Sequence, residues 1–246
     1  MVNKKVKVKV LYASPEDLKD AILITGFQGF GGVGYITTRY LVNKLNAKFV
    51  GYVFSYYMPD VTFSMNRKIA LPYEIYLYKG ANRNIIILLN NAVPLVEKAY
   101  FADAVMSWAS ESGISEAILV GGLDISTKQG EGDFRCLPNS HYKGEIPGPI
   151  LEDDLYIIGP LALMSIFSEI YKIPAIIVLP YTEPSRADPA AAAKAVEVIS
   201  KMCNLNVDTS ELYEDARAIE AELKKISELR RSIERRLEEG KTTHYM

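Results

Sequence analysis

The sequence predicts an α/β protein with a mostly parallel sheet that is flanked by helices on both faces. Short apolar runs alternate with segments of helical periodicity along most of the chain. The runs are almost continuously apolar, as strands buried on both faces of a parallel sheet require. The strand–helix–strand order favours right-handed crossovers, which give an α/β sandwich. A long amphipathic helix pattern follows this core.

The expected elements follow one another from the N-terminus. The opening stretch alternates charged residues with valine, which predicts a strand. Buried strands are expected at Ala21–Thr25, Lys48–Phe54, Asn84–Leu89, Glu116–Val120 and Pro174–Pro180. Helices are expected at Gly32–Leu45, Leu95–Ser112 and Pro160–Tyr171. A further strand, Tyr73–Lys79, is expected to pair antiparallel with Asn84–Leu89, because the link 80–83 is short enough for a hairpin.

Two helix starts carry clear capping signals. Asp188 provides an N-cap and Pro189 the first helical position of a helix with apolar residues at helical spacing. Asp208 provides the next N-cap, and Glu211 three residues later predicts a capping box. In contrast, Asp124–Asp153 shows no clear periodicity, and so long a loop is usually functional or mobile.

Three parts are expected in the chain: an α/β core over residues 1–207, a long amphipathic helix over 208–239, and a flexible tail over 240–246. With 246 residues the chain can bury a large core. Its net charge of -2 gives no global field that favours nucleic acid or an anionic membrane. No apolar run approaches the ~18 residues of a membrane span.

The two cysteines, Cys136 and Cys203, lie far apart and have no paired spacing. This argues against a disulfide framework and suits a reducing cytoplasm. The start of the chain lacks the apolar stretch of a signal peptide. We therefore expect a cytoplasmic protein without nucleic-acid or membrane partners.

The glycine-rich segment Gly29–Gly34 fits G-x-G-x-x-G, follows a predicted strand and opens a predicted helix. Its backbone amides could hold a phosphate. However, the next strand ends at Phe54–Ser55 without the acid that a dinucleotide ribose needs. We interpret the segment mainly as a tight strand-to-helix turn. An enzyme of the nucleoside phosphorylase or hydrolase type, with phosphate in this turn, stays open as an alternative.

Other candidate catalytic groups are weaker. Cys136 and His141 could be paired as nucleophile and base, but nothing in the sequence positions them. Their spacing, together with nearby acids, fits no familiar metal site. The acids Glu152–Asp154 suit a solvated turn better than an acid/base pair. We therefore expect no catalytic residues, no metal and no cofactor.

An aromatic segment and the last helix are the candidate interaction surfaces. Tyr56, Tyr57, Met58 and Phe63 lie in a loop or edge segment of a kind that is typical of interfaces. These side chains could equally cap the end of the sheet within one chain. In the last helix, heptad spacing from Leu212 gives a narrow apolar stripe. The stripe contains Ala216, Ile219, Leu223, Ile226, Ile233 and Leu237.

The stripe suits a coiled-coil contact or an arm laid along another subunit, with Leu223, Ile226 and Ile233 as the oligomer interface. The alternative is an ordinary terminal helix that docks on its own domain. Glu238 and Glu239 in the last turn oppose the helix dipole, so we expect this end to fray and free the tail.

Several segments together resemble the proteasome assembly chaperone family. The strongest are Pro184–Pro189, the alanine-rich helix after it, and Leu205–Leu212. Ile24–Phe27 and Val120–Gly122 agree with the family in order and spacing, and the resemblance spans about residues 18–237. It implies a fold similar to that of nucleoside phosphorylases, without an established catalytic site. It also implies a homo-oligomer, and eukaryotic relatives help to assemble the proteasome α-ring.

The chain also resembles an archaeal branch of that family in its last residues. In that branch a hydrophobic residue, a tyrosine and a final residue enter a pocket between proteasome α-subunits. Carried over by position, Tyr245 would be the anchor and Met246 would supply the carboxylate. His244 stands where an apolar residue is preferred, which would weaken each tail. Several tails on one oligomer would compensate through effective concentration.

The leading hypothesis is thus an ATP-independent chaperone or activator of the proteasome core particle, which docks C-terminal tails on the α-ring. The sequence has no Walker-type phosphate loop, which supports independence from ATP. The alternatives are the phosphorylase- or hydrolase-like enzyme and an oligomeric scaffold without proteasome contact.

Overall fold

A nine-stranded mixed sheet forms the centre of the molecule, with strand order β1-β3-β6-β7-β2-β8-β11-β10 and β9 paired with β11. The computed structural model describes residues 6–65 and 67–225. The strands of this sheet are β1 Val6–Val10, β2 Ile22–Gly26, β3 Lys48–Ser55, β6 Tyr73–Tyr78, β7 Ile85–Asn90, β8 Glu116–Val120, β9 Leu123–Asp124, β10 Phe134–Pro138 and β11 Ala175–Thr182. The α/β class predicted from the sequence is confirmed.

The middle of the sheet is parallel. β2 lies between β7 and β8 and is parallel to both, and β11 is parallel to β8. All residues of β2, β7 and β11 are buried, which explains why these strands are apolar almost without interruption. The sequence placed each of these strands within two residues of its observed bounds.

Antiparallel strands complete both edges. β6 and β7 form the hairpin that the sequence predicted, with Tyr73 opposite Asn90. β3 pairs antiparallel with β6, and β1 with β3. On the other edge β10 runs antiparallel to β11. The sequence analysis missed β10, because it lies inside the segment Asp124–Asp153, where glycine and proline obscure the short strand.

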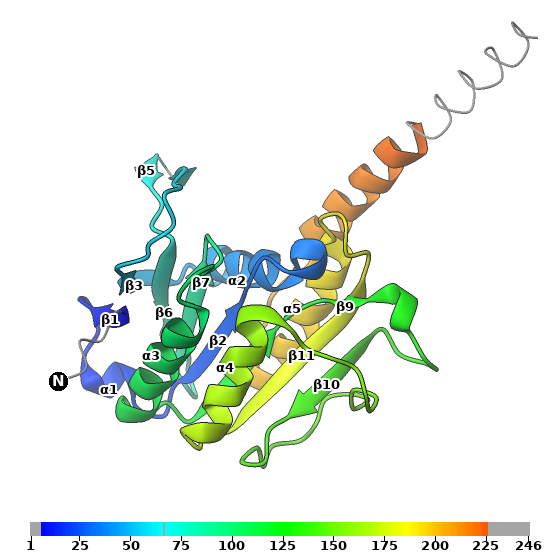
Figure 1. Cartoon of the computed structure of the whole chain (residues 1–246). Helices are drawn as coiled ribbons and strands as arrows, with labels where there is room; N and C mark the ends of the chain where they lie inside the picture. Colours follow the sequence, from blue (N-terminus) through cyan, green and yellow to red (C-terminus); the bar gives the residue numbers. More distant parts are fainter. Residues whose placement is uncertain (1–5, 66, 226–246) are drawn as a thin grey trace, which may run out of the picture.

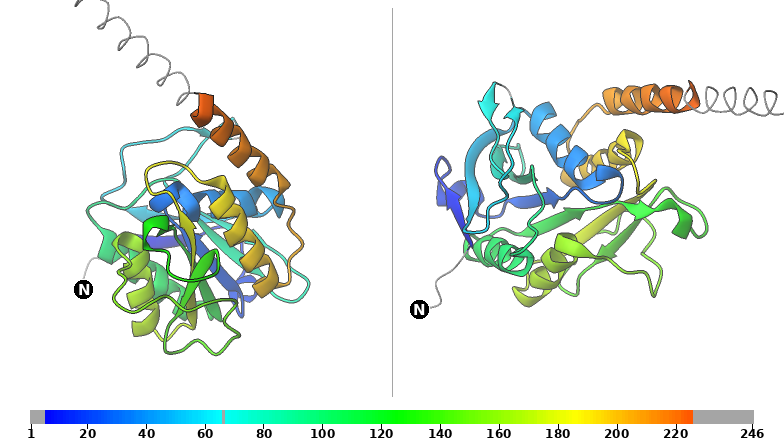
Figure 2. Two further views of the ribbon diagram at one scale, coloured as in Figure 1. Left: turned by 90° about the vertical axis from the view of Figure 1, so that its right-hand side faces the viewer. Right: turned by 45° about the horizontal axis from the view of Figure 1, so that its top comes forward.

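Helices cover both faces of the sheet, as predicted (Figures 1 and 2). α2 (Val33–Lys44) and α5 (Pro189–Cys203) pack against each other on one face, where the core contains Leu41 and Val196. α3 (Lys98–Glu111) and α4 (Gly159–Ile170) cover the opposite face, around Phe101 and Met164. The short helix α1 (Pro15–Leu18) begins with a capping box in which Ser14 is the N-cap. Two 3-10 turns are also present, η1 (Phe30–Gly32) and η2 (Ile125–Thr127).

Two segments extend from this body (Figure 1). The first contains a small antiparallel pair, β4 (Ser64–Met65) and β5 (Lys68–Ile69), and we call residues 56–65 and 67–72 the arm. The second is the C-terminal helix, which occupies residues 210–225 of the described chain. Residues 204–209 connect α5 to this helix. The helix runs away from the sheet (Figure 2).

Candidate partner-binding surfaces

The glycine-rich turn between β2 and α2 is a site of close packing. A Cβ on Gly34 would lie 2.5 Å from the carbonyl oxygen of Val120, and a Cβ on Gly26 would lie 2.6 Å from Cα of Gly34. Gly31 has φ +62°, and a Cβ there would lie 2.0 Å from Oγ1 of Thr182. These glycines let α2 begin directly against the sheet. The geometry thus agrees with the interpretation of a tight strand-to-helix turn.

A pocket opens beside this turn, at the carboxyl ends of β2 and β8. α2, which follows β2, covers one face of the sheet, whereas α4 covers the other face next to β8. Such a crevice at a topological switch point is the usual ligand site of open α/β sheets. The cavity measures about 230 Å³. Its lining includes Phe27, Phe30, Gly121, Gly122, Tyr156, Ile158, Leu161 and Leu179. We call it the sheet-edge pocket.

The sheet-edge pocket is apolar. Within the described part of the chain its lining contains no aspartate, glutamate, lysine, arginine or histidine, and Tyr156 is its one ionisable residue. A phosphate or a sugar that leaves water needs compensating hydrogen bonds, and the only polar side chains that the described residues of this lining offer are those of Gln28 and Tyr156. The pocket therefore does not favour the phosphorylase- or hydrolase-like alternative. Sequence reasoning missed this pocket, although glycines after β8 and the apolar residues before α4 both contribute to it.

The segment that carried the family resemblance holds the end of β11 to the glycine turn. Asp188 accepts a hydrogen bond from the Thr182 hydroxyl at 2.8 Å and caps α5 by accepting from the Ala191 amide at 3.0 Å. Its own amide donates to the Gly31 carbonyl at 2.9 Å. Asp188 is therefore the N-cap that the sequence predicted. It has a structural role that ties three segments together.

Arg135 orders the segment that showed no periodicity in the sequence. Its buried guanidinium donates from Nε to Glu152 at 2.6 Å and from Nη1 to the carbonyls of Glu131 and Phe134. Nη2 donates to the Gln129 carbonyl, and the group lies over the Tyr181 ring at 5.1 Å. One side chain thus joins the loop before β10 to Glu152 near the end of this segment. Glu152, treated in the sequence as a solvated turn residue, is the ion-pair partner.

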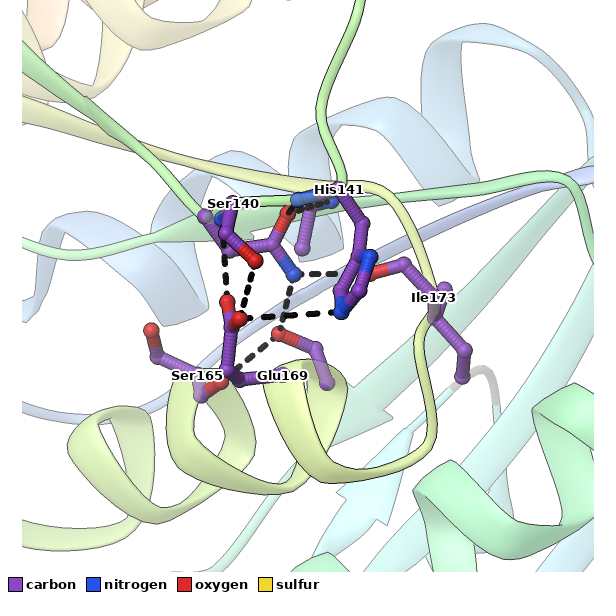
Figure 3. A network of polar contacts seen from close by, with 8 residues as sticks. Ser140, His141, Ser165, Glu169 and Ile173 are labelled. Carbon is purple, nitrogen blue, oxygen red and sulfur yellow. Dashed lines mark hydrogen bonds and ion pairs between the residues drawn. The ribbon is translucent and has the colours of Figure 1, made fainter.

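Cys136 and His141 face different environments and do not form a catalytic pair in the structure. Cys136 is fully buried in the core beside α5, and burial raises the pKa of its thiol to about 11. His141 instead lies 3.6 Å from the carboxylate of Glu169 (Figure 3). Glu169 also accepts hydrogen bonds from the amide and hydroxyl of Ser140. This network fastens the loop after β10 to α4.

Within residues 6–65 and 67–225, no group of three or more histidine, cysteine, aspartate or glutamate side chains could hold a metal ion. The same part of the chain has no helix that combines the length and apolar character needed to span a bilayer.

The aromatic segment at the base of the arm divides into two parts. Met58 packs against the core beneath α3 and α4, as expected of a residue that caps the sheet. Tyr56 is 66% exposed and touches Phe54 edge to face with ring centroids 5.2 Å apart. Tyr57 and Phe63 are also exposed. Met58 therefore contributes to the core of its own chain. The exposed rings of Tyr56, Tyr57 and Phe63 stay candidates for an interface.

The C-terminal helix is docked on its own domain at its start. Leu212 is buried in the core beneath α2 and α5, Tyr213 donates to Glu197 at 2.7 Å, and Tyr40 donates to the Asp208 carbonyl at 2.7 Å. Glu211 forms an ion pair with Lys44 at 2.6 Å. The predicted capping box is therefore wrong, because Asp208 accepts from the Ser210 amide at 3.0 Å and the Glu211 side chain bonds to α2.

The apolar stripe becomes more exposed along this helix. Ala216 and Ile219 are half-buried, and Leu223 is 42% exposed. Of the predicted oligomer contacts, Ile226 and Ile233 lie outside the described residues, as do the tail residues His244, Tyr245 and Met246. The interface stays a prediction for all of these residues, and so does the division of the chain at residues 207 and 239.

Comparisons with known proteins agree with this architecture. The model of the PAC2 family matches residues 23–227. An uncharacterized protein of Methanocaldococcus jannaschii is 25% identical over 221 residues, which cover 86% of this chain and 84% of that relative.

Two solved structures from Pyrococcus furiosus share the fold. PbaA, an archaeal homolog of proteasome-assembly chaperone, has a TM-score of 0.78 at 24% identity, covering 98% of this chain and 100% of that chain. PbaB, an archaeal proteasome activator, has a TM-score of 0.74 at 23% identity, covering 91% of this chain and 99% of that chain. The family expected from the sequence is thus confirmed.

Proposed function

The chain belongs to the PAC2 family, and from this membership we propose that it is a chaperone or activator of the proteasome core particle. Structural relatives described as a proteasome-assembly chaperone homolog and a proteasome activator support the proposal. It acts without ATP, since the sequence contains no Walker-type phosphate loop. We place its action in the cytoplasm, as a homo-oligomer.

The observation that carries the proposal is the course of the C-terminal helix. Leu212 is buried on the core, whereas from residue 220 onward every described side chain is exposed. The described part of the helix thus runs away from the body (Figure 1). We propose that Tyr245 and Met246 dock on α-subunits of the core particle and that His244 lowers the affinity of each tail. Several tails in one oligomer then raise the total affinity.

A pull-down with purified proteasome α-rings tests the tail. The intact chain is compared with a chain that lacks Thr243–Met246 and with Tyr245→Ala, while Thr243→Ala serves as the matched control. We expect the intact chain and the control to be retained and the other two to be lost. Equal retention of all four removes the tail from the mechanism. If even the intact chain fails to bind, the scaffold without proteasome contact is favoured.

The enzyme alternative has a separate test. A nucleoside or phosphate that binds the folded state raises the melting temperature in a saturable way. We expect no shift, because the lining of the sheet-edge pocket lacks the charged groups that would hold either ligand. A saturable shift would favour the phosphorylase- or hydrolase-like enzyme instead.

A further inference from the structure

We propose that the sheet-edge pocket of one copy receives Ile69 from the arm of a second copy. The pocket does not favour a polar ligand, because its lining is apolar and carries no charged side chain. At about 230 Å³ it is also smaller than the ~300–1,000 Å³ that is usual for small-ligand sites. A cavity of this kind suits one aliphatic anchor side chain from a protein partner.

The surface around the pocket extends the apolar contact beyond one side chain. Ile158 is 70% exposed, and Phe30 and Tyr156 are exposed beside it. Leu95 and Val96, which follow β7 at the same edge of the sheet, are exposed as well. Exposed apolar residues that surround an apolar pocket mark protein–protein contacts. The occupant is therefore a polypeptide segment.

The arm supplies an apolar segment of the required kind. Ile69 is 76% exposed in β5, and Val61 and Phe63 are exposed on the same arm. The arm has a defined shape, because Thr62 donates to the Ala70 carbonyl at 2.7 Å and the Ala70 amide donates to the Phe63 carbonyl at 3.0 Å. A preorganised segment loses little entropy when it binds. No arm residue lines the sheet-edge pocket of its own chain.

Charges beside the two apolar elements are complementary. Arg67 and Lys68 directly precede Ile69, and Asp153 and Asp154 lie just before Tyr156. All four are exposed, and none forms an ion pair with another described residue. Opposite charges that flank an anchor and its pocket fix orientation and favour encounter. This complementarity is the reason that we choose a second copy of the same chain as the occupant.

The contact is head-to-tail, because the arm and the pocket are different surfaces. Heterologous contacts of this type close into rings when the rotation between copies permits. A ring would place several C-terminal helices in one assembly. The inference rests on the homo-oligomer of the proposed function, but its test requires no proteasome.

Sedimentation velocity of the full chain over a range of concentrations measures the assembly. We expect an oligomer whose dissociation constant rises roughly thirtyfold in Ile69→Ser, the loss usual for an anchor side chain. Ile170→Ser is the matched control, because Ile170 is 59% exposed at the far end of α4 from the pocket. A monomeric wild type at every concentration overturns the proposal, as does equal assembly of Ile69→Ser.

The pocket is tested by filling it. A Cβ on Gly29 meets no heavy atom within 4 Å, so Gly29→Leu places a side chain in the open space of the lining, and Gly29→Ala is its control. We expect Gly29→Leu to dissociate and Gly29→Ala to assemble. Circular dichroism melts show that each variant is folded. Assembly of a folded Gly29→Leu variant contradicts the proposal.

A charge exchange tests the pairing directly. We expect Arg67→Glu with Lys68→Glu to weaken assembly, and the further changes Asp153→Lys and Asp154→Lys in the same chain to restore it. Lys143→Glu, on an exposed loop, controls for net charge. Failure of the fourfold variant to recover overturns the proposed partner surface. We expect a chain without the tail to assemble like the intact chain, so failure of proteasome binding and failure of the arm contact are distinguished.

Discussion

The hydroxyl of Thr182 donates a 2.8 Å hydrogen bond to Oδ2 of Asp188, and Oδ1 of the same carboxylate caps α5. The last residue of β11 and the start of α5 are thus joined through one side chain. Because the Asp188 amide also donates to Gly31, the glycine turn is held in the same arrangement.

Loss of this carboxylate removes two hydrogen bonds at once. We expect Asp188→Ala to lower the free energy of unfolding by about 2 kcal/mol, the sum of a lost N-cap and an unpaired hydroxyl. Urea denaturation at neutral pH measures the change. Ser185→Ala serves as control, since its hydroxyl contacts Glu183 on the surface. If the two variants are equally stable, Asp188 does not have the structural role assigned to it.

The contact between α2 and the sheet leaves no room for a side chain at Gly34. A methyl group there would lie 2.5 Å from the Val120 carbonyl oxygen and 2.7 Å from the Phe27 nitrogen. Both are backbone atoms, so the helix itself must shift. We expect Gly34→Ala to cost about 1–3 kcal/mol of unfolding free energy. Gly29→Ala, in open space, is expected to stay within about 0.5 kcal/mol of the wild type by the same denaturation assay.

Removal of the Arg135 guanidinium leaves the carbonyls of residues 129, 131 and 134 without their donor. It also leaves the Glu152 carboxylate, 24% exposed, without its cation. We expect Arg135→Met to lower the free energy of unfolding by about 3 kcal/mol. This value is at the lower end for a broken buried ion pair, because the Glu152 carboxylate is partly exposed to solvent. Hydrogen exchange of amides 124–153 should accelerate.

The control for Arg135 is Arg83→Met. Arg83 lies 3.8 Å from Glu116 and is more than half exposed, so we expect a cost below about 1 kcal/mol. Equal costs for the two arginines would mean that the buried network does not order the segment.

Acid should weaken the junction between the loop after β10 and α4. Hydrogen bonds from the Ser140 hydroxyl and amide, with a smaller contribution from His141, hold the pKa of Glu169 below its ordinary value of 4.5. The unfolded chain therefore binds a proton at higher pH than the folded one. The stabilisation is fully present above pH 4.5 and is lost as pH falls through the lowered pKa.

Melting temperatures between pH 7 and pH 3 test this dependence. Glu169→Gln should melt below the wild type at neutral pH, and the difference should shrink once the pH falls below about 4.5. Glu214→Gln, on the exposed side of the C-terminal helix, controls for the loss of one charge. A difference that is constant with pH would exclude Glu169 as the titrating group.

The central strands and most helices could be predicted because their signals are local. The apolar run Glu116–Val120 coincides with β8, and the signal Asp188–Pro189 gives the start of α5. β10 could not be found in this way, because it pairs with β11, from Phe134 opposite Pro180 to Pro138 opposite Ile176, and this pairing is remote in sequence. The predicted capping box failed for a similar reason, since Glu211 pairs with Lys44 of a distant helix and Asp208 accepts from the Ser210 amide.

The candidate surfaces were predicted only in part. Tyr56 and Phe63 are exposed as an interface requires, but aromatic composition alone did not indicate that Met58 turns inward. The sheet-edge pocket could not be predicted, because it assembles from segments after β2, after β8 and before α4. Only the topology of the sheet brings these segments to one edge.

The central position of β2 has a consequence for synthesis on the ribosome. β2 is the second strand of the chain, yet its neighbours β7 and β8 begin at Ile85 and Glu116. α2 follows directly and packs against one face, but both backbone edges of the strand wait for sequence that is translated much later. Until Asn90 emerges neither edge of Ile22–Gly26 is paired, and until Val120 emerges the edge that pairs with β8 stays open; such exposed strand edges aggregate easily. Cotranslational holdase chaperones should therefore bind this segment first.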